Sequence, residues 1–390
     1  MRYRSWQTLL GSYLANFKLL RVLALENTTL GRPSASRIHL GTDMGRLLGS
    51  LVYLRYLSLR GSDLETFPWI HKLVLLQTLK LNVHDVINKS PMSTNVLGKF
   101  AYLRHLYLPA YYSANLSENF KLRFNGLSKL ETLEEFDTKW CEVKDLPKLF
   151  CLRRLKLEAV GGYDVKEMFK YLPGIALSSN SCILYLTLTI PMHEQMGFEY
   201  DPDMIRQLIW NHKFIFARLS LEGKLPEFSE IFVQEQQLNH THIDVSLIRI
   251  TKLRLGYSLL EEDPMPVLEK IPTLRDLSLQ FFAYQGKEMV CSAIGFPRLT
   301  ALNLLYLANL EKWRVEEGSM PVLQHLQIFT CPELEELPEG LIFLHSLHKV
   351  MLTDMPLKFC DKVRLENGEQ GPDFYKVAHV PDLIVEHPRF

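Results

Sequence analysis

The sequence lacks the features that mark nucleic-acid-binding, membrane-spanning and exported proteins. Its 390 residues contain 44 Lys and Arg against 44 Asp and Glu, so the chain as a whole has no basic field to hold nucleic acid or anionic lipid. No stretch approaches the roughly 18 apolar residues that a spanning helix needs. No apolar segment follows the basic residues Arg2 and Arg4, so a signal peptide is not expected. The expected compartment is the cytoplasm.

Cysteine, glycine and proline are also sparse. The six cysteines are far apart and form no Cys-x-x-Cys pair, which argues against a structural zinc module and favours a reducing compartment. Cys141 and Cys331 are expected to be packing residues rather than reactive thiols. Glycine and proline number 20 each, too few for a collagen-like or linker-dominated chain, and 47% apolar residues exclude wholesale disorder.

Motifs for catalysis or phosphate binding are missing as well. The sequence has no G-x-x-x-x-G-K-[ST] loop, no G-x-S-x-G elbow and no H-E-x-x-H pair. The segment Asn239–Asp244 contains His240 and His242, but no third ligand follows at helical or turn spacing, so we interpret it as a polar loop. We therefore predict a non-enzymatic protein with no catalytic residue, cofactor or metal ligand.

The dominant positive signal is a repeat of the form L-x-x-L-x-L. We find thirteen units with a mean spacing of about 27 residues, within the 20–29 typical of leucine-rich repeats. Their leading residues are Leu20, Leu54, Leu76, Leu103, Leu133, Leu152, Ile183, Phe216, Ile250, Leu274, Leu299, Leu323 and Leu347.

Alternation within each unit predicts a short strand whose leucines point one way and whose x residues point the other. Because one such strand cannot bury its apolar face alone, neighbouring units must stack in parallel. The predicted fold is an α/β repeat solenoid, a leucine-rich-repeat horseshoe with a parallel concave sheet and an irregular or short helical convex side. We expect a helical lead-in over 1–16, the solenoid over 17–355 and a C-terminal cap or tail over 356–390. The long units between Leu152 and Ile250 are expected to hold short helices or loops.

The x residues of the strands form the candidate binding surface. Solenoids bind partners on the concave face, and aromatic and arginine side chains are enriched at binding hot spots. The candidate residues are Tyr56, Ser58, Arg60, Lys80, His105, Tyr107, Asp137, Arg154, Lys156, Tyr185, Arg218, Lys252, Arg254, Asp276, Gln280, His325, Gln327 and Phe329. For any one of them alone, a solvated strand side chain is the simpler interpretation.

Several segments resemble plant intracellular immune receptors that combine a coiled coil, a nucleotide-binding domain and leucine-rich repeats. The resemblance covers roughly residues 15–385 and includes LVYLRYLSLRGSDLETFPWIHKL, DPMPVLEK and VEEGSMP. It implies a defence role in which the repeats recognise a pathogen effector or a guarded host protein. It also implies contact with a nucleotide-binding domain, in the same chain or another, that the repeats restrain. The family's phosphate-binding loop and coiled coil are absent from this sequence, so we assign the family's exchange between ADP and ATP to no residue of this sequence.

Two other classes of protein use such repeats. A substrate-selecting adaptor of a ubiquitin ligase would need an F-box-like helical segment ahead of the repeats, and residues 1–16 are too short for one. A secreted receptor ectodomain would be expected to have disulfide caps and an asparagine ladder after the strands, and both are missing.

Overall fold

The computed structural model describes residues 16–25, 39–40, 42–59, 63–64, 70–81, 95–108, 121–178, 181–195, 198–211, 214–232, 248–366 and 369–386. The chain divides into two compact units, Met1–Ile183 (unit 1) and Leu184–Phe390 (unit 2). Three sequence predictions lie outside the described residues: the lead-in over 1–16 apart from Asn16, the candidate residue Arg60, and the polar loop over 239–244.

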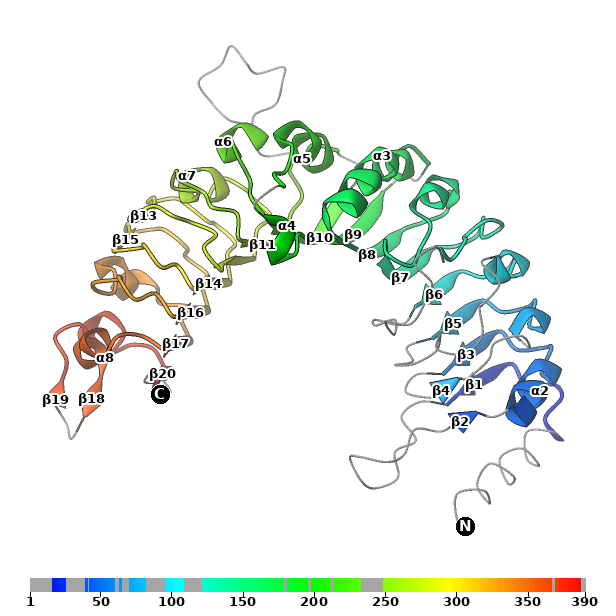
Figure 1. Ribbon diagram of the computed structural model, residues 1–390. Helices are drawn as coiled ribbons and strands as arrows, with labels where there is room; N and C mark the ends of the chain where they lie inside the picture. The colour runs from blue at the N-terminus through cyan, green and yellow to red at the C-terminus, as the bar shows by residue number, and fades with distance from the viewer. Residues whose placement is uncertain are drawn as a thin grey trace. The chain divides into compact units, whose positions relative to one another are not determined.

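Unit 1 is built on short parallel strands that lie side by side, with helices and turns on the other side (Figure 1). The strands, in sheet order, are β1 (Val22–Ala24), β3 (Tyr56–Ser58), β5 (Thr78–Lys80), β6 (His105–Tyr107), β7 (Thr132–Asp137) and β8 (Arg154–Val160). The middle leucine of each repeat pairs with that of the next, in the series Leu23, Leu57, Leu79, Leu106, Leu133 and Leu155.

Unit 2 continues the same construction within its own boundaries. Its strands, in sheet order, are β9 (Cys182–Thr189, of which Leu184–Thr189 belong to this unit), β10 (Phe214–Glu222), β11 (Lys252–Gly256), β12 (Asp276–Gln280), β14 (Ala301–Leu305), β16 (His325–Phe329), β17 (Lys349–Thr353) and β20 (Asp382–Glu386). From β10 onward the paired middle residues are Leu219, Leu253, Leu277, Leu302, Leu326, Val350 and Leu383. The predicted parallel sheet with one strand per repeat is confirmed.

The leucine positions form the core of each unit. In β12, for example, Leu277 and Leu279 are fully buried, whereas Ser278 between them is partly exposed. Each buried leucine is covered by the corresponding residues of the preceding and following repeats, so no repeat is stable in isolation.

The side opposite the strands carries short helices and turns. The helices are α2 (Thr42–Ser50), α3 (Gly162–Ser178), α4 (Met192–Gln195), α5 (Pro202–Ile209), α6 (Phe228–Ile231) and α7 (Met265–Leu268), with 3₁₀ turns η1 (Ile70–Lys72), η2 (Val96–Lys99), η3 (Val143–Lys148) and η5 (Glu339–Phe343). Two small parallel pairs lie outside the main sheet, β2 (His39–Leu40) with β4 (Asp63–Leu64) and β13 (Glu288–Cys291) with β15 (Lys312–Val315). The prediction that the long units hold short helices is confirmed by α3, α5 and α6.

The repeat frame differs from the prediction in unit 1 at β7. Leu133 is the middle residue of its unit, paired with Leu106, and the leading residue is the buried Leu130. A bulge follows Leu133, with Glu135 in the left-handed backbone region, and Phe136 then pairs with Leu157. The repeat pattern therefore assigned Leu133 to the wrong repeat position, because the extra residues of a bulge shift the alternation of buried and exposed side chains.

A second frame difference lies in β9. Ile183, predicted as a leading core residue, is 41% exposed, while Cys182 and Leu184 on either side of it are buried. The strand begins earlier than the repeat pattern implies, so its alternation already applies at Ile183.

The predicted tail contains one more strand of the sheet. It folds as α8 (Leu357–Val363), an antiparallel pair β18 (Leu365–Glu366) with β19 (Glu369–Gln370), the 3₁₀ turn η6 (Phe374–Lys376) and then β20, which pairs with β17. The buried Lys376 fixes η6 to η5 through Leu337 O at 2.8 Å and Glu339 at 3.1 Å. The sequence Val380-x-x-Leu383-x-Val385 fits the repeat with valine for leucine, so this strand was detectable.

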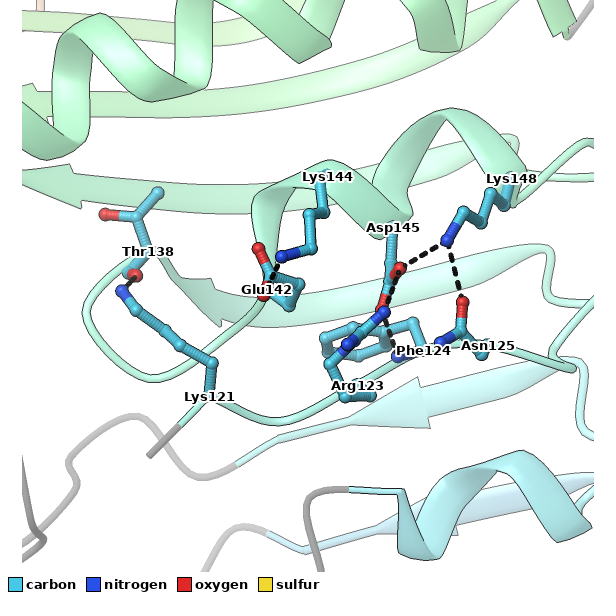
Figure 2. A network of polar contacts seen from close by, with 9 residues as sticks. All are labelled: Lys121, Arg123, Phe124, Asn125, Thr138, Glu142, Lys144, Asp145 and Lys148. Atoms are coloured by element: carbon cyan, nitrogen blue, oxygen red, sulfur yellow. Dashed lines mark hydrogen bonds and ion pairs between the residues drawn. The ribbon is translucent and has the colours of Figure 1, made fainter. Parts of the chain in front are cut away.

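A polar network connects the turn η3 to the segment before it in unit 1 (Figure 2). The fully buried carboxylate of Asp145 accepts hydrogen bonds from Arg123 Nε at 2.7 Å, from the Phe124 backbone N–H at 3.1 Å and from Lys148 Nζ at 2.8 Å. Lys148 also donates to the side chain of Asn125 at 2.9 Å. The two stretches of backbone are otherwise joined by a single parallel bridge, Leu122 with Cys141, so a carboxylate with this many donors adds a second connection between them.

Candidate binding surface

The strand face, defined as the outward side chains of the parallel strands, is charged and aromatic in unit 1. Lys80 Nζ lies over the rings of Tyr56 and Tyr107, from the strands on either side, at 5.6 and 5.2 Å. His105 Nδ1 is 3.1 Å from the hydroxyl of Thr132 on the next strand. Because adjacent strands align these side chains, they form cross-strand pairs that fix one another's positions.

The bulge in β7 contributes two carboxylates that the sequence reasoning missed. Glu134 accepts an ion pair from Arg154 at 2.8 Å, and Glu135 accepts one from Lys156 at 2.6 Å. Both basic side chains remain about half exposed, at 47% and 48%. Each carboxylate lies on the strand before its basic partner, a pairing that the bulge makes possible.

Two predicted surface residues in unit 1 are placed differently by the structure. Ser58 is fully buried at the end of β3 and presents nothing to a partner. Asp137 pairs with Glu158 rather than with Lys156, because the bulge shifts it along the strand. Burial raises the pKa of Asp137 against the opposing effect of the Lys139 backbone N–H, which donates to Asp137 at 2.7 Å. Asp137 therefore closes a turn at the strand end.

In unit 2 the predicted residues again lie along the strands. Lys252 and Asp276 form an ion pair at 3.0 Å, and Arg254 lies 3.8 Å from Glu222. Gln280 is the exception, because it is 97% buried and its Nε2 has no partner among the described residues. The other predicted residues of this unit are partly or fully exposed: Tyr185, Arg218, His325, Gln327 and Phe329.

An aromatic stack at the ends of the unit 2 strands was also missed. Tyr257, Phe281 and Tyr306 each follow a strand directly, and each lies seven residues after the leading residue of its repeat. Their ring centroids are 5.3 and 5.0 Å apart, with interplanar angles of 9° and 18°. Three aromatics at one repeat position were the sequence signal that could have revealed the stack.

The prediction that Cys141 and Cys331 are packing residues is confirmed, because both are buried and neither is in a disulfide. Burial raises the pKa of Cys331 to about 11, and its Sγ is 3.7 Å from the carbonyls of Leu304 and Phe329. Within the described ranges, no group of three His, Cys, Asp or Glu side chains could hold a metal ion. Among the same residues, no helix has the length and apolar character to cross a bilayer.

The chain resembles proteins of one class along almost all of its length. Residues 4–361 match the family model described as leucine-rich repeat region. From Arabidopsis thaliana, the probable disease resistance protein RF9 is 33% identical over 97% of this chain, and the disease resistance protein RPH8A is 33% identical over 86%. These alignments span 32% and 34% of the relatives, so the chain covers about a third of their length.

Solved structures give more distant similarities. An internalin from Listeria monocytogenes has a TM-score of 0.41 and 13% identity, covering 97% of this chain and 84% of the internalin. A leucine-rich repeat protein from Bacteroides eggerthii has a TM-score of 0.39 and 13% identity, covering 94% and 66%. Because the strand register, the family match and the similarity to the plant relatives agree, the chain belongs to the leucine-rich repeat family, in the form found in plant disease resistance proteins.

Proposed function

We propose that this chain is the recognition region of a plant intracellular immune receptor and that its strand face senses a pathogen effector or a guarded host protein. The observation that carries the proposal is the 33% identity to a disease resistance protein over 97% of the chain. The strand face supports it, because charged and aromatic side chains lie on the strands of both units, such as Tyr107 on β6 and Lys156 on β8 in unit 1 and Arg254 on β11 in unit 2. Residues held this way bind with little loss of side-chain freedom.

The proposal includes a second contact, with a nucleotide-binding domain that the repeats restrain in the cytoplasm until a partner binds. The relatives are about three times as long as this chain, and the part of their length that this chain does not cover is long enough to contain such a domain. The chemistry that we assign to this chain is binding alone, without a catalytic residue or a cofactor.

The test is a triple substitution of the strand face, Tyr107→Ala, Lys156→Glu and Arg254→Glu. We expect it to abolish effector-dependent capture of a partner in leaf tissue, because hot-spot truncation and charge reversal each cost binding energy. The melting temperature should stay within a few degrees of wild type, because exposed charged pairs contribute about 0–1 kcal/mol. Capture is measured by co-immunoprecipitation against a panel of secreted pathogen proteins, and stability by circular dichroism.

The matched control carries the same types of change on the opposite side of the units. Tyr163→Ala, Lys144→Glu and Arg314→Glu alter residues on α3, η3 and β15 that are at least as exposed as those they replace in the test. This control should leave capture intact. Capture that survives the strand-face variant and is lost in the control would contradict the proposal.

A further inference from the structure

The turns that lead into the strands of unit 1 have apolar tips. In each turn the backbone N–H of the leading residue donates to the carbonyl three residues earlier, as from Leu54 to Leu51 and from Leu103 to Phe100, both at 3.0 Å. The two residues between donor and acceptor form the tip, a position that usually holds polar residues, glycine or proline. Two of the tips, Lys18-Leu19 and Ser128-Lys129, contain a lysine, but four are apolar: Val52-Tyr53, Val74-Leu75, Ala101-Tyr102 and Phe150-Cys151.

The apolar tips are exposed to solvent. Their exposed fractions lie between 42% and 60% in Val52, Tyr53, Val74, Tyr102 and Phe150. The residues that flank each tip, such as Leu51 and Leu54, are buried and do the packing. From the repeat of Tyr53 to that of Phe150 the row crosses four strand spacings, or about 19 Å. A row of exposed apolar side chains is costly in water, and such rows mark contact surfaces.

The fold does not require apolar residues at these tips. In unit 2 the same hydrogen bond closes the turns that end at Leu274, Leu299, Leu323 and Leu347. Their tips contain the usual turn residues: Pro272-Thr273, Pro297-Arg298, Pro321-Val322 and His345-Ser346. The apolar tips of unit 1 are therefore an addition to the solenoid and are not needed to close its turns.

A row of arginines runs beside the tips. The residues immediately before the six strands of unit 1 are Arg21, Arg55, Gln77, Arg104, Glu131 and Arg153. Backbone hydrogen bonds join them from one repeat to the next. The Arg55 N–H donates to the Arg21 carbonyl at 2.8 Å, and the Gln77 N–H donates to the Arg55 carbonyl at 2.7 Å. The row is thus fixed parallel to the tips, with about 4.8 Å between neighbouring members.

Most of the positive charge in this row is unpaired. Its acidic member, Glu131, lies 3.1 Å from Arg104. Arg21, Arg55 and Arg153 are exposed, and none of them forms an ion pair with another described residue. Lys129, at one of the tips, lies over the ring of Tyr102 at 4.6 Å. Cations and exposed aromatic rings therefore share one edge of the unit.

The whole of unit 1 has the same sign of charge. It contains 25 Lys and Arg against 15 Asp and Glu, whereas unit 2 contains 19 against 29. The zero net charge of the chain is thus a balance between a basic unit and an acidic one. Because salt screens charges beyond about 10 Å at 0.1 M, a surface that touches this edge responds mainly to the charges nearby.

The combination matches the surface of an anionic bilayer. Tyrosine and phenylalanine favour the depth of the lipid headgroups, and the long arginine side chain reaches the phosphates while its stem lies against apolar groups. Basic residues near an anionic leaflet are attracted to it. A bilayer accepts apolar tips at any spacing, whereas a protein partner would need a matching pocket for each anchoring side chain.

We propose that the entry edge of unit 1 binds the surface of a bilayer that contains anionic phospholipids. The entry edge consists of the segments that hold the tips and the arginine row: 17–21, 51–55, 73–77, 100–104, 127–131 and 149–153. The apolar tips enter the headgroup region, and the arginines contact lipid phosphates. This inference goes beyond the proposed function, because it uses none of the strand-face residues and involves no effector.

The test is co-sedimentation of the chain with vesicles of phosphatidylcholine, either pure or with about 30% phosphatidylserine. We expect binding to the anionic vesicles to be at least tenfold tighter at about 0.1 M NaCl, because each nearby cation strengthens it about fivefold. Raising the salt to about 0.5 M should remove most of that difference. Equal binding to the two kinds of vesicle, or no binding to either, would overturn the proposal.

Two triple variants separate the charges from the apolar tips. Replacing Arg21, Arg55 and Arg153 with glutamine should weaken binding to the anionic vesicles at least tenfold. Replacing Tyr53, Tyr102 and Phe150 with serine should weaken it about fivefold to tenfold and leave its salt dependence in place, because the cations remain. Circular dichroism shows whether each variant is folded, and the comparison of vesicles with wild type tests the proposal even if one is not.

The matched control changes the corresponding edge of unit 2, through Arg275→Gln, Arg298→Gln and Val322→Ser. All three residues are exposed. Binding should stay within twofold of wild type. An equal loss in this control and in the arginine variant of unit 1 would show that the entry edge is not the site. If wild type binds polyglutamate but not anionic vesicles, the edge is a protein contact and the proposal is wrong. The strand-face experiment contains no vesicles, so either result can fail without the other.

Discussion

Replacing Leu277 with alanine is expected to lower the free energy of unfolding by about 2–5 kcal/mol, the usual range when a buried leucine is truncated and leaves a cavity in the core. Leu277 is fully buried in the middle of β12, and it pairs with Leu253 on one side and Leu302 on the other. Both neighbours are themselves buried, at 3% and 0% exposure. The side chain therefore belongs to two inter-repeat interfaces, and its truncation weakens both.

The effect should be local as well as large. In a repeat protein, stability is close to a sum over the interfaces between neighbouring repeats. One part of the array can therefore unfold before another, and a single free energy of unfolding is then not well defined. We therefore expect faster hydrogen exchange in the amides of β11, β12 and β14, with less change at β17. Urea unfolding followed by circular dichroism gives the total loss, and the exchange experiment shows where it arises.

Ser278→Ala is the matched control, one residue along the same strand with its side chain on the strand face. It should change the free energy of unfolding by less than about 0.5 kcal/mol, as exposed substitutions usually do. A loss below 1 kcal/mol in Leu277→Ala, with exchange unchanged in β11 and β14, would mean that the repeats do not share one core.

The repeat register was predictable because burial imposes it. A strand shifted by one residue would move every leucine to the wrong face, so the spacing of leucines alone fixes which residues pair. That argument gives the pairing of Leu57 with Leu79, or of Leu302 with Leu326, without any structure. It fails where the backbone departs from simple alternation, as at the bulge after Leu133.

The surface was predictable only in outline. The alternation correctly placed Lys80, Arg154 and Lys252 on the strand face, but it could not reveal what those side chains contact. Ser58 and Gln280 show that the residue ending a strand can be buried where the chain turns away. The shared repeat position of Tyr257, Phe281 and Tyr306 indicates that the three side chains are neighbours, but the stacking geometry also depends on left-handed backbone, with φ of 53°, 48° and 56°.

Replacing Asp145 with alanine is expected to destabilise unit 1 by about 3 kcal/mol. The substitution removes charge-assisted hydrogen bonds, worth about 1.5–3 kcal/mol each, and leaves a buried backbone donor unsatisfied at about 1–3 kcal/mol. That donor is the Phe124 N–H. The sum is reduced because Arg123 and Lys148 are 30% and 52% exposed and can turn to water.

The pH dependence gives a second and sharper readout for Asp145. Burial alone would raise the pKa of this carboxyl, but hydrogen bonds from Arg123, Lys148 and the Phe124 N–H outweigh burial and lower it. A carboxyl with a lowered folded-state pKa binds protons more weakly in the folded chain than in the unfolded one. Its contribution is complete above the unfolded-state pKa of about 3.9 and is lost as the pH falls through the lower folded-state value.

Asp145→Asn separates charge from shape in this network. It keeps an acceptor for the Phe124 N–H but has no proton to gain, so the difference in stability between wild type and variant should shrink as the pH falls below about 4. Comparing the two proteins cancels the other carboxyls, including Asp137, whose pKa is raised. Glu142→Gln, which removes the partly exposed ion pair with Lys144 at 3.0 Å, is the control and should cost less than about 1 kcal/mol. A difference that stays constant from pH 7 to pH 3 would show that the charge of Asp145 does not stabilise the fold, because a charged network in this position must weaken when its carboxylate is protonated.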